Sequence, residues 1–286
     1  MDVVNVVAEI RHRVAAWKTE GLRVGLVPTM GNLHEGHLQL ITEMQRRADR
    51  VLVSIFVNPL QFGASEDFSS YPRTFETDCE KLAELNVDVV FAPSTEEVYP
   101  DGVPLMTEVS VPALADKLCG EFRPGHFTGV ATVVAKLFNL MQPDVAIFGK
   151  KDYQQLTIIC RMVRDLNFPV EIVAAPTVRD SDGLAKSSRN GYLTSTERGS
   201  ARLLYAVLES VAGLIRRGAR DFSSIESQGI NSLNDAGFRP EYLSVRRQAD
   251  LAVPGPEDRE LVVVAAVWLG RTRLIDNIEV RTPARS

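Results

Sequence analysis

The chain of 286 residues is long enough for about two domains of roughly 150 residues, and a chain of this size needs no disulfide or metal staple to fold. Its hydrophobic share of 45% and charged share of 24% are typical of globular proteins and exclude a disordered or fibrous chain. The 32 basic and 37 acidic residues leave a net charge of −5, which gives no electrostatic basis for binding nucleic acid or an anionic membrane.

The first 175 residues alternate short apolar runs with longer amphipathic segments, such as residues 130–141, whose apolar side chains recur at intervals of three and four. The apolar runs are typical of strands buried on both faces of a parallel sheet. They cover residues 23–28, 50–57, 87–93, 144–149 and 170–175. This alternation predicts an α/β fold with a doubly wound, Rossmann-like parallel sheet, whose ligands bind beyond the carboxyl ends of the strands.

The pattern changes after a polar loop at residues 176–190. Capping boxes at Thr194 with Glu197 and at Ser223 with Glu226 predict the starts of two helices. Strands are predicted at residues 242–246, 260–269 and 278–280. Mixed helices and strands of this kind predict a smaller α+β domain.

We therefore predict a Rossmann-like domain over residues 1–176 and an α+β domain over residues 177–286. The longest apolar run, residues 261–269, is too short to span a membrane. The three cysteines lack the C-x-x-C spacing of a zinc site, which fits free thiols in a reducing compartment. We expect a cytoplasmic protein without a membrane partner.

The first predicted strand runs into the turn PTMGNLHEGH, which carries His34 and His37. Gly31 and Gly36 leave the backbone free for a tight turn, and a helix that begins near Gly36 directs its N–H groups toward it. Two imidazoles beside a helix N-terminus suit a phosphate chain. A structural helix cap and a His-x-x-His metal pair fit the same spacing, so all three interpretations stay open on this motif alone.

A second polar string, GLAKSSRNGYL, begins at Gly183 in the loop that leads to the second domain. Its Ser187, Ser188 and Arg189 can clamp a polyphosphate, although such strings are common in solvated loops. Combined with the histidine turn, the string is similar to the HIGH and KMSKS pair of the nucleotidylyltransferase superfamily.

Polar groups follow further predicted strands or open a further helix. They are Asn58 and Gln61 in SIFVNPLQFG, Arg123 and His126 in RPGHFTGVATVV, and Lys151, Asp152 and Gln155 in FGKKDYQQL. Each segment alone fits a polar loop without a ligand. Because all of them fall where a doubly wound sheet places its ligand cleft, they indicate one site.

These motifs, in this order and spacing and together with YPRTFETDCEKL, resemble the pantoate–β-alanine ligase (pantothenate synthetase) family over essentially the whole chain. The resemblance implies ATP-dependent condensation of pantoate with β-alanine through a pantoyl-adenylate intermediate, with release of pyrophosphate and AMP. It also implies Mg²⁺, small-molecule partners only, and a homodimer.

The resemblance further implies roles for individual residues. ATP contacts are implied for Met30, Gly31, Asn32, Leu33, His34, Glu35, Gly36, His37, Gly149, Lys150, Lys151, Asp152, Val178, Lys186, Ser187, Ser188 and Arg189. Catalytic roles are implied for His34, His37, Lys151 and Arg189, with His37 protonating or stabilising the α-phosphate. Gln61 and Gln155 are implied to hold pantoate, and Gln61 also β-alanine. The metal ligands stay unassigned, Asp78 being one residue considered.

Three positions depart from the family pattern: Lys150 and Cys119 each replace a Glu, and Lys186 replaces an apolar residue. Substitutions in solvated loops generally have little effect, but these make the mouth of the predicted cleft more positive. We therefore expect Lys186 to add a contact to the ATP triphosphate, whereas position 119 has lost an acid for the β-alanine ammonium.

Two alternative functions remain at this stage. A nucleotidylyltransferase that acts on another small acceptor uses the same ATP clamp and yields a stable adenylated product. A catalytically silent module binds ATP and releases no pyrophosphate. The amide-rich NPLQFG and YQQL segments favour a small polyhydroxy acid, and thus the ligase.

Overall fold

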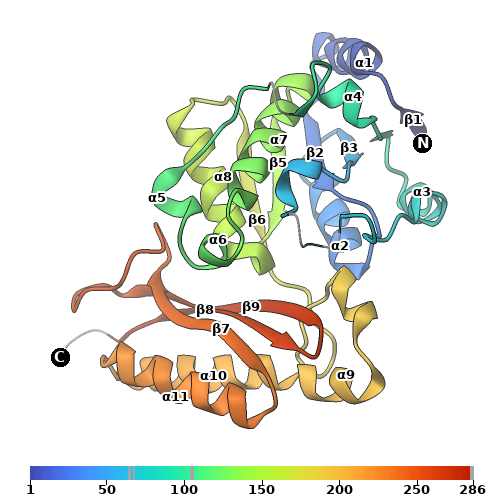
Figure 1. Cartoon of the computed structure of the whole chain (residues 1–286). Helices are drawn as coiled ribbons and strands as arrows, with labels where there is room; N and C mark the ends of the chain where they lie inside the picture. Colours follow the sequence, from blue (N-terminus) through green and yellow to red (C-terminus); the bar gives the residue numbers. More distant parts are fainter. Residues whose placement is uncertain (64–65, 67, 104–105, 284–286) are drawn as a thin grey trace. The chain divides into compact units, whose positions relative to one another are not determined.

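A computed structural model describes residues 1–63, 66, 68–103 and 106–283 of the chain (Figure 1). It divides into two compact units. The first comprises Met1–Lys150 and Ile158–Pro176, and the second Lys151–Thr157 and Thr177–Ser286. The first unit carries a parallel sheet with helices and the second an antiparallel sheet with helices, which confirms the predicted fold class.

The sheet of the first unit has six strands, all parallel, in the order β1-β4-β3-β2-β5-β6. These strands are β1 (Asp2–Val4), β2 (Val24–Thr29), β3 (Arg50–Ile55), β4 (Val89–Phe91), β5 (Val145–Gly149) and β6 (Glu171–Ala175). The five predicted strands are present as β2 to β6. The edge strand β1 was not predicted, because three residues are too few to show a periodicity.

The helices that connect these strands differ widely in length. They are α1 (Val7–Thr19), α2 (Glu35–Met44), η1 (Pro59–Gln61), α3 (Phe75–Glu84), α4 (Thr95–Val98), α5 (Pro112–Ala115), α6 (Cys119–Phe122), α7 (His126–Met141), η3 (Lys150–Asp152) and α8 (Tyr153–Asp165). Ile41 and Met44 of α2 are completely buried against the sheet. A side chain at Gly25 of β2 would place its Cβ 2.3 Å from the Met44 sulfur, so this glycine lets α2 lie directly on the strand.

The strand order reverses at β2, which pairs with β3 on one side and with β5 on the other. Leu26 of β2 lies opposite Ala146 of β5, so both strands run out at the same edge of the sheet. A reversal of this kind leaves a crevice beyond the carboxyl ends of the two strands, where doubly wound sheets bind ligands. The residues that follow Thr29 and Gly149 therefore lie at the position best suited to a site.

The second unit contains a three-stranded antiparallel sheet in the order β7-β8-β9. Its strands are β7 (Arg239–Arg247), β8 (Glu260–Leu269) and β9 (Thr272–Arg281), and its helices are η4 (Ser188–Tyr192), α9 (Ser195–Ala201), α10 (Leu203–Arg216) and α11 (Phe222–Asp235). Helices α10 and α11 lie side by side along one face of this sheet (Figure 1). Leu208, Ile215, Leu233 and Val263 are among the fully buried side chains of their shared core.

Two sequence predictions for this unit are wrong in detail. The last strand spans Thr272–Arg281 rather than three residues, because Asp276 and Asn277 interrupt its apolar pattern. Helix α11 begins at Phe222, with the Asp221 carboxylate accepting a hydrogen bond from Ser224 N at 3.0 Å, so Ser223 is not its cap. The predicted capping box of Thr194 and Glu197 is confirmed at α9.

No helix in the described part of the chain combines the length and apolar character needed to cross a membrane.

Gly129 of α7 offers a test of how closely this helix packs on η1. A Cβ at this position would lie 2.3 Å from the Leu60 carbonyl oxygen, a backbone atom that cannot rotate away. We expect Gly129→Ala to lower the free energy of unfolding by about 1–3 kcal/mol, measured by urea denaturation. Gly199→Ala is the matched control, because a Cβ at Gly199 of α9 meets no atom within 4 Å. Equal stabilities for the two variants would contradict this close packing.

Candidate active site

The turn from β2 into α2 carries most of the predicted ATP-binding residues of the first unit. Two consecutive residues adopt left-handed backbone angles, Gly31 with a φ of 81° and Asn32 with a φ of 50°. The buried carboxylate of Asp78 accepts hydrogen bonds from Asn32 N at 2.8 Å and from Leu33 N at 2.7 Å. The side chain of Leu33 is itself buried in the core, so the turn is fixed from two sides.

His34 and His37 hold each other and the start of α2 in place. His34 Nδ1 accepts a hydrogen bond from Gly36 N at 3.1 Å, and His37 Nδ1 lies 3.4 Å from the donor His34 N. The two rings stack, with centroids 4.1 Å apart and an interplanar angle of 29°. A nitrogen that accepts a hydrogen bond from a main-chain N–H carries no proton of its own. This geometry assigns Nδ1 of each ring as the acceptor and Nε2 as the N–H donor.

The side chain of Gln61, in η1 after β3, is held by a buried amide. Asn58 Nδ2 donates to Gln61 Oε1 at 3.2 Å and to the Gly129 carbonyl at 3.1 Å. Asn58 Oδ1 in turn accepts a hydrogen bond from the Tyr99 hydroxyl at 2.8 Å. Burial raises the pKa of Tyr99 well above its usual value, so the phenol stays protonated as a donor. Gln61 Nε2 lies 2.9 Å from the Met30 sulfur, which places a predicted pantoate residue beside a predicted ATP residue.

The RPGH motif, residues 123–126, supports the main chain of Gln61. His126 Nδ1 lies 2.7 Å from the Gln61 carbonyl oxygen, and His126 Nε2 lies 2.9 Å from Arg123 Nη1. Because a carbonyl only accepts and a guanidinium only donates, His126 is a neutral imidazole with its proton on Nδ1. Arg123 also forms an ion pair with Glu66 at 2.6 Å. This motif thus contributes to the site by positioning Gln61.

Predicted residues of the second unit begin with Lys151, whose main chain is bound to β9. Asn277 Nδ2 donates to the Lys151 carbonyl at 2.9 Å, and the Tyr153 hydroxyl donates to Glu279 at 3.1 Å. The Lys151 ammonium lies 3.7 Å from the carboxylate of Asp152. Gln155 follows on α8. Lys150 belongs to the first unit, so the peptide bond between Lys150 and Lys151 joins the two sets of predicted residues.

A buried ion pair holds the loop that contains Val178 and Lys186. The Arg179 guanidinium binds both carboxylate oxygens of Asp276, at 2.6 and 2.8 Å, and lies 3.8 Å from the centroid of the Tyr205 ring. Lys186 N donates to the Val178 carbonyl at 2.9 Å. Asp276 precedes Asn277 in β9, so one strand supports both this loop and Lys151.

The phosphate-clamp string follows directly in this loop. Ser187 accepts a hydrogen bond from Arg189 N at 3.3 Å and caps η4, which contains Ser188 and Arg189. The Lys186 ammonium pairs with Asp180, which also binds Arg198 at 2.9 Å. The charge of Lys186 is therefore balanced within the loop. Cys119 is buried at the start of α6.

Several supporting residues were missed by sequence reasoning. Tyr99, Arg179 and Asp276 touch the predicted site residues or their immediate neighbours and were not singled out, whereas Asp78 was considered only as a metal ligand and not as a support of the histidine turn. One signal was available: Asp78 lies four residues before the buried Leu82, on the apolar face of an amphipathic helix, where a carboxylate needs partners.

A resident metal site finds little support among the described residues. Asp78, considered as a metal ligand, already accepts hydrogen bonds from Asn32 N, Leu33 N and the Thr74 hydroxyl. Within the described residues, no three His, Cys, Asp or Glu side chains gather closely enough to hold a metal ion. Mg²⁺ commonly binds through substrate phosphates and only one or two carboxylates.

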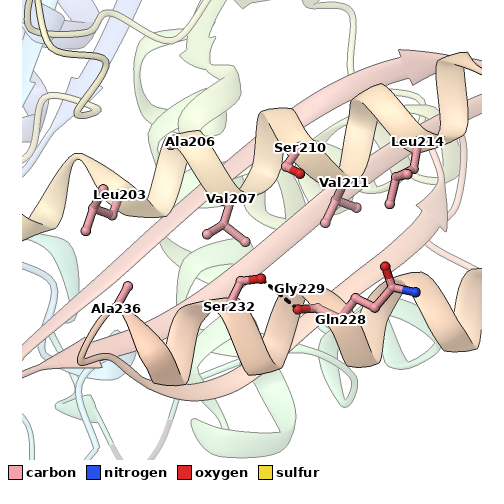
Figure 2. Close-up of a pocket in the computed structure, with 10 residues that line it drawn as sticks. All are labelled: Leu203, Ala206, Val207, Ser210, Val211, Leu214, Gln228, Gly229, Ser232 and Ala236. Atoms are coloured by element: carbon pink, nitrogen blue, oxygen red, sulfur yellow. Dashed lines mark hydrogen bonds between the residues drawn. The ribbon is translucent and has the colours of Figure 1, made fainter.

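A groove of about 370 Å³ lies between α10 and α11 (Figure 2). Aliphatic and small residues line it, including Val207, Leu214 and Gly229, together with Ser210 and Ser232. Ser232 donates its hydroxyl to the Gln228 carbonyl at 2.9 Å. The groove has no titratable group and contains no predicted site residue, so it is not a candidate for the active site.

Comparison with known proteins agrees with this fold. The family model described as pantoate-beta-alanine ligase matches residues 2–279. A pantothenate synthetase of Alkalilimnicola ehrlichii is 60% identical over 273 residues, which cover 96% of this chain and 96% of that protein. The crystal structure of pantothenate synthetase from Thermus thermophilus aligns with a TM-score of 0.91 at 46% identity, covering 98% of this chain and 100% of that one.

A further solved relative is the pantoate-beta-alanine ligase of Francisella tularensis, described as complexed with beta-gamma ATP and beta-alanine. It aligns with a TM-score of 0.81 at 34% identity and covers 97% of each chain. The fold and the polar groups at the strand reversal define a doubly wound α/β enzyme with an added α+β domain. Within that class, the chain belongs to the pantoate–β-alanine ligase family, the pantothenate synthetases.

The hydrogen bond between Tyr99 and Asn58 can be isolated by a double-mutant cycle. Tyr99→Phe removes one of two donors to the buried Asn58 Oδ1, the other being Leu60 N at 3.3 Å, so we expect a loss of about 0.5–1.5 kcal/mol in unfolding free energy. In the background of Asn58→Ala the same substitution should cost clearly less, because the acceptor is gone. Urea denaturation of the four proteins measures the coupling. Additive losses would show that the two groups do not interact.

Proposed function

We propose that the chain joins pantoate to β-alanine in two steps that use ATP. The pantoate carboxylate attacks the α-phosphorus of ATP, which forms pantoyl adenylate and releases pyrophosphate. The β-alanine amine then attacks the acyl carbon, loses a proton and expels AMP, which gives pantothenate. Membership of the family supports this reaction, and so does the relative described as complexed with beta-gamma ATP and beta-alanine.

The observation that carries the proposal is the pair of stacked imidazoles at the N-terminus of α2. In the first step two anions approach each other and negative charge builds up on the α-phosphate. Fixed N–H donors lower this barrier because they need no reorganisation as the charge develops. We propose that His34 and His37 donate from Nε2 to the phosphates. In this role His37 stabilises the charge that develops on the α-phosphate or protonates it.

The other predicted residues are proposed to position and neutralise the substrates. Lys151 and Arg189 supply cations to the phosphates and to the pantoate carboxylate. Gln61 presents its Nε2 donor, because its Oε1 is held by Asn58, and binds pantoate together with Gln155. No side chain acts as a covalent nucleophile, so catalysis depends on positioning and charge.

Further features of the proposal follow from the family and from general chemistry. Mg²⁺ enters as the complex with ATP and is thus part of the substrate. A homodimer and a cytoplasmic location complete the proposal. The assignment of residues 1–176 and 177–286 to separate domains is likewise proposed.

Exchange of labelled pyrophosphate into ATP tests the first step directly. We expect exchange that requires pantoate and Mg²⁺ and proceeds without β-alanine, and we expect pantothenate and AMP once β-alanine is added. His37→Ala should reduce exchange about 100-fold or more, because a donor to the developing charge is lost. His37→Gln, which retains an N–H near the Nε2 position, should lose less.

Other outcomes of the same assay identify the alternatives. A stable adenylated product that no amine consumes would indicate a nucleotidylyltransferase. Binding of ATP without any exchange, for pantoate or other small acids, would indicate a silent nucleotide-binding module.

Lys186 offers a separate test of the phosphate clamp. The proposed contact requires the Lys186 ammonium to exchange Asp180 for the triphosphate. On that basis we expect Lys186→Met to raise the KM for ATP about threefold to fivefold at low ionic strength and to leave kcat unchanged. The difference should shrink in high salt, which screens exposed charges. Lys18→Met is the matched control, since Lys18 also pairs with an aspartate, Asp144, at 3.1 Å. An unchanged KM at low salt would contradict the contact.

A further inference from the structure

The Asp78 carboxylate has no exposed surface and faces the main chain of the histidine turn. Its Oδ1 accepts from Leu33 N at 2.7 Å, and its Oδ2 accepts from Asn32 N at 2.8 Å. The Thr74 hydroxyl donates to the same Oδ2 at 3.1 Å. One turn further along α3, the Lys81 ammonium donates to the Leu33 carbonyl at 2.7 Å. Helix α3 therefore binds both the donor and the acceptor of one peptide segment in the turn.

The backbone of this segment needs such support. Asn32 has a φ of 50°, a left-handed conformation that disfavours residues with a Cβ, and it directly follows Gly31, whose φ is 81°. Successive N–H groups in a conformation of this kind point toward one anion, which here is supplied by the protein itself. A Cβ at Gly31 would lie 3.1 Å from Asp78 Oδ2, so the carboxylate is closely packed under the turn.

The next residue after this segment is His34, which caps α2 and stacks on His37. The direction of both imidazoles therefore depends on the backbone conformation of the turn that leads into α2. Asp78 belongs to a different helix and its two oxygens are engaged by three protein donors, so it acts on the histidines only through the main chain.

We propose that Asp78 is a positioning residue for the adenylation step: by binding the N–H groups of Asn32 and Leu33 it sets the direction of the His34 and His37 Nε2–H donors. This inference rests on the proposed function of the two histidines. In this proposal Asp78 does not contact the substrate. Its hydrogen bonds to the main chain of the turn explain why a carboxylate is buried beside a proposed anion-binding site.

Asp78→Asn changes the shape of the side chain little. It tests the proposal because it replaces one acceptor oxygen by an NH₂ group, which cannot accept a hydrogen bond from the main-chain N–H that it faces. In pyrophosphate exchange we expect kcat/KM for ATP to fall at least tenfold, while the KM for pantoate stays within twofold. Thr74→Val is the matched control: it removes only the hydroxyl donor and leaves both main-chain hydrogen bonds, so its kcat/KM should stay within twofold of the parent chain.

Histidine ¹⁵N resonances provide a readout that a merely structural role would not move. The chain has four histidines, and His12 on α1 lies outside this network and serves as an internal control. We expect His34 and His37 to show the Nε2–H tautomer in the parent chain and to shift or broaden in Asp78→Asn, with His12 unchanged. Native kinetics or unchanged His34 and His37 resonances in folded Asp78→Asn would overturn the proposal.

A second variant covers the case in which Asp78→Asn does not fold. Lys81→Met removes the hydrogen bond to the Leu33 carbonyl and keeps the carboxylate, so we expect a smaller loss in kcat/KM for ATP in the same direction. No loss there would overturn the proposal. If the parent chain itself shows no exchange, the proposed function fails, and the histidine resonances still decide whether Asp78 directs the imidazoles.

Discussion

The reversal of strand order at β2 is the constraint on which the first unit depends. Because β2 lies between β3 and β5, the segments after Thr29 and Gly149 leave the sheet side by side. In a parallel sheet covered by helices, polar groups can reach a ligand at few positions. The carboxyl ends of the strands at this reversal form one such position. The histidine turn follows β2, and η1 follows β3. Their polar side chains therefore lie at the same edge of the sheet as the end of β5.

Protonation states in this unit are set by hydrogen bonds from neighbouring groups. Main-chain N–H donors place the protons of His34 and His37 on Nε2, whereas the Gln61 carbonyl and Arg123 place the proton of His126 on Nδ1. A neutral imidazole held in one tautomer is a directional donor. Such donors suit a reaction in which charge builds up on a phosphate and no substrate proton has to be removed in the first step.

Three parts of the proposed site are supported by buried polar side chains. Asp78 supports the histidine turn, Asn58 and Tyr99 support Gln61, and Asp276 supports the loop of the phosphate clamp through Arg179. A buried polar group without its partner is costly, so these networks have one favourable arrangement. Rigid placement of donors is what a catalyst without a covalent nucleophile requires.

The predicted strands, the capping box of Thr194 and the motifs of the site could be recognised from the sequence, because apolar periodicity and caps are local signals. The extent of β9 could not, since Asp276 and Asn277 are polar for a reason that lies in Arg179 and Lys151, about a hundred residues away. Tyr99 was overlooked, and the contact of Asp78 with the histidine turn was not foreseen, for the same reason.

The sequence by itself thus determined the fold class, the family and the side chains available for chemistry. Only the tertiary structure decided which hydrogen-bond partners these side chains have, that Nδ1 of His34 and of His37 accepts from the main chain, and that Lys186 is paired with Asp180. The physical reason is that a hydrogen bond depends on the distance and direction between atoms, and chain folding brings those atoms together from segments whose separation leaves no pattern in the sequence.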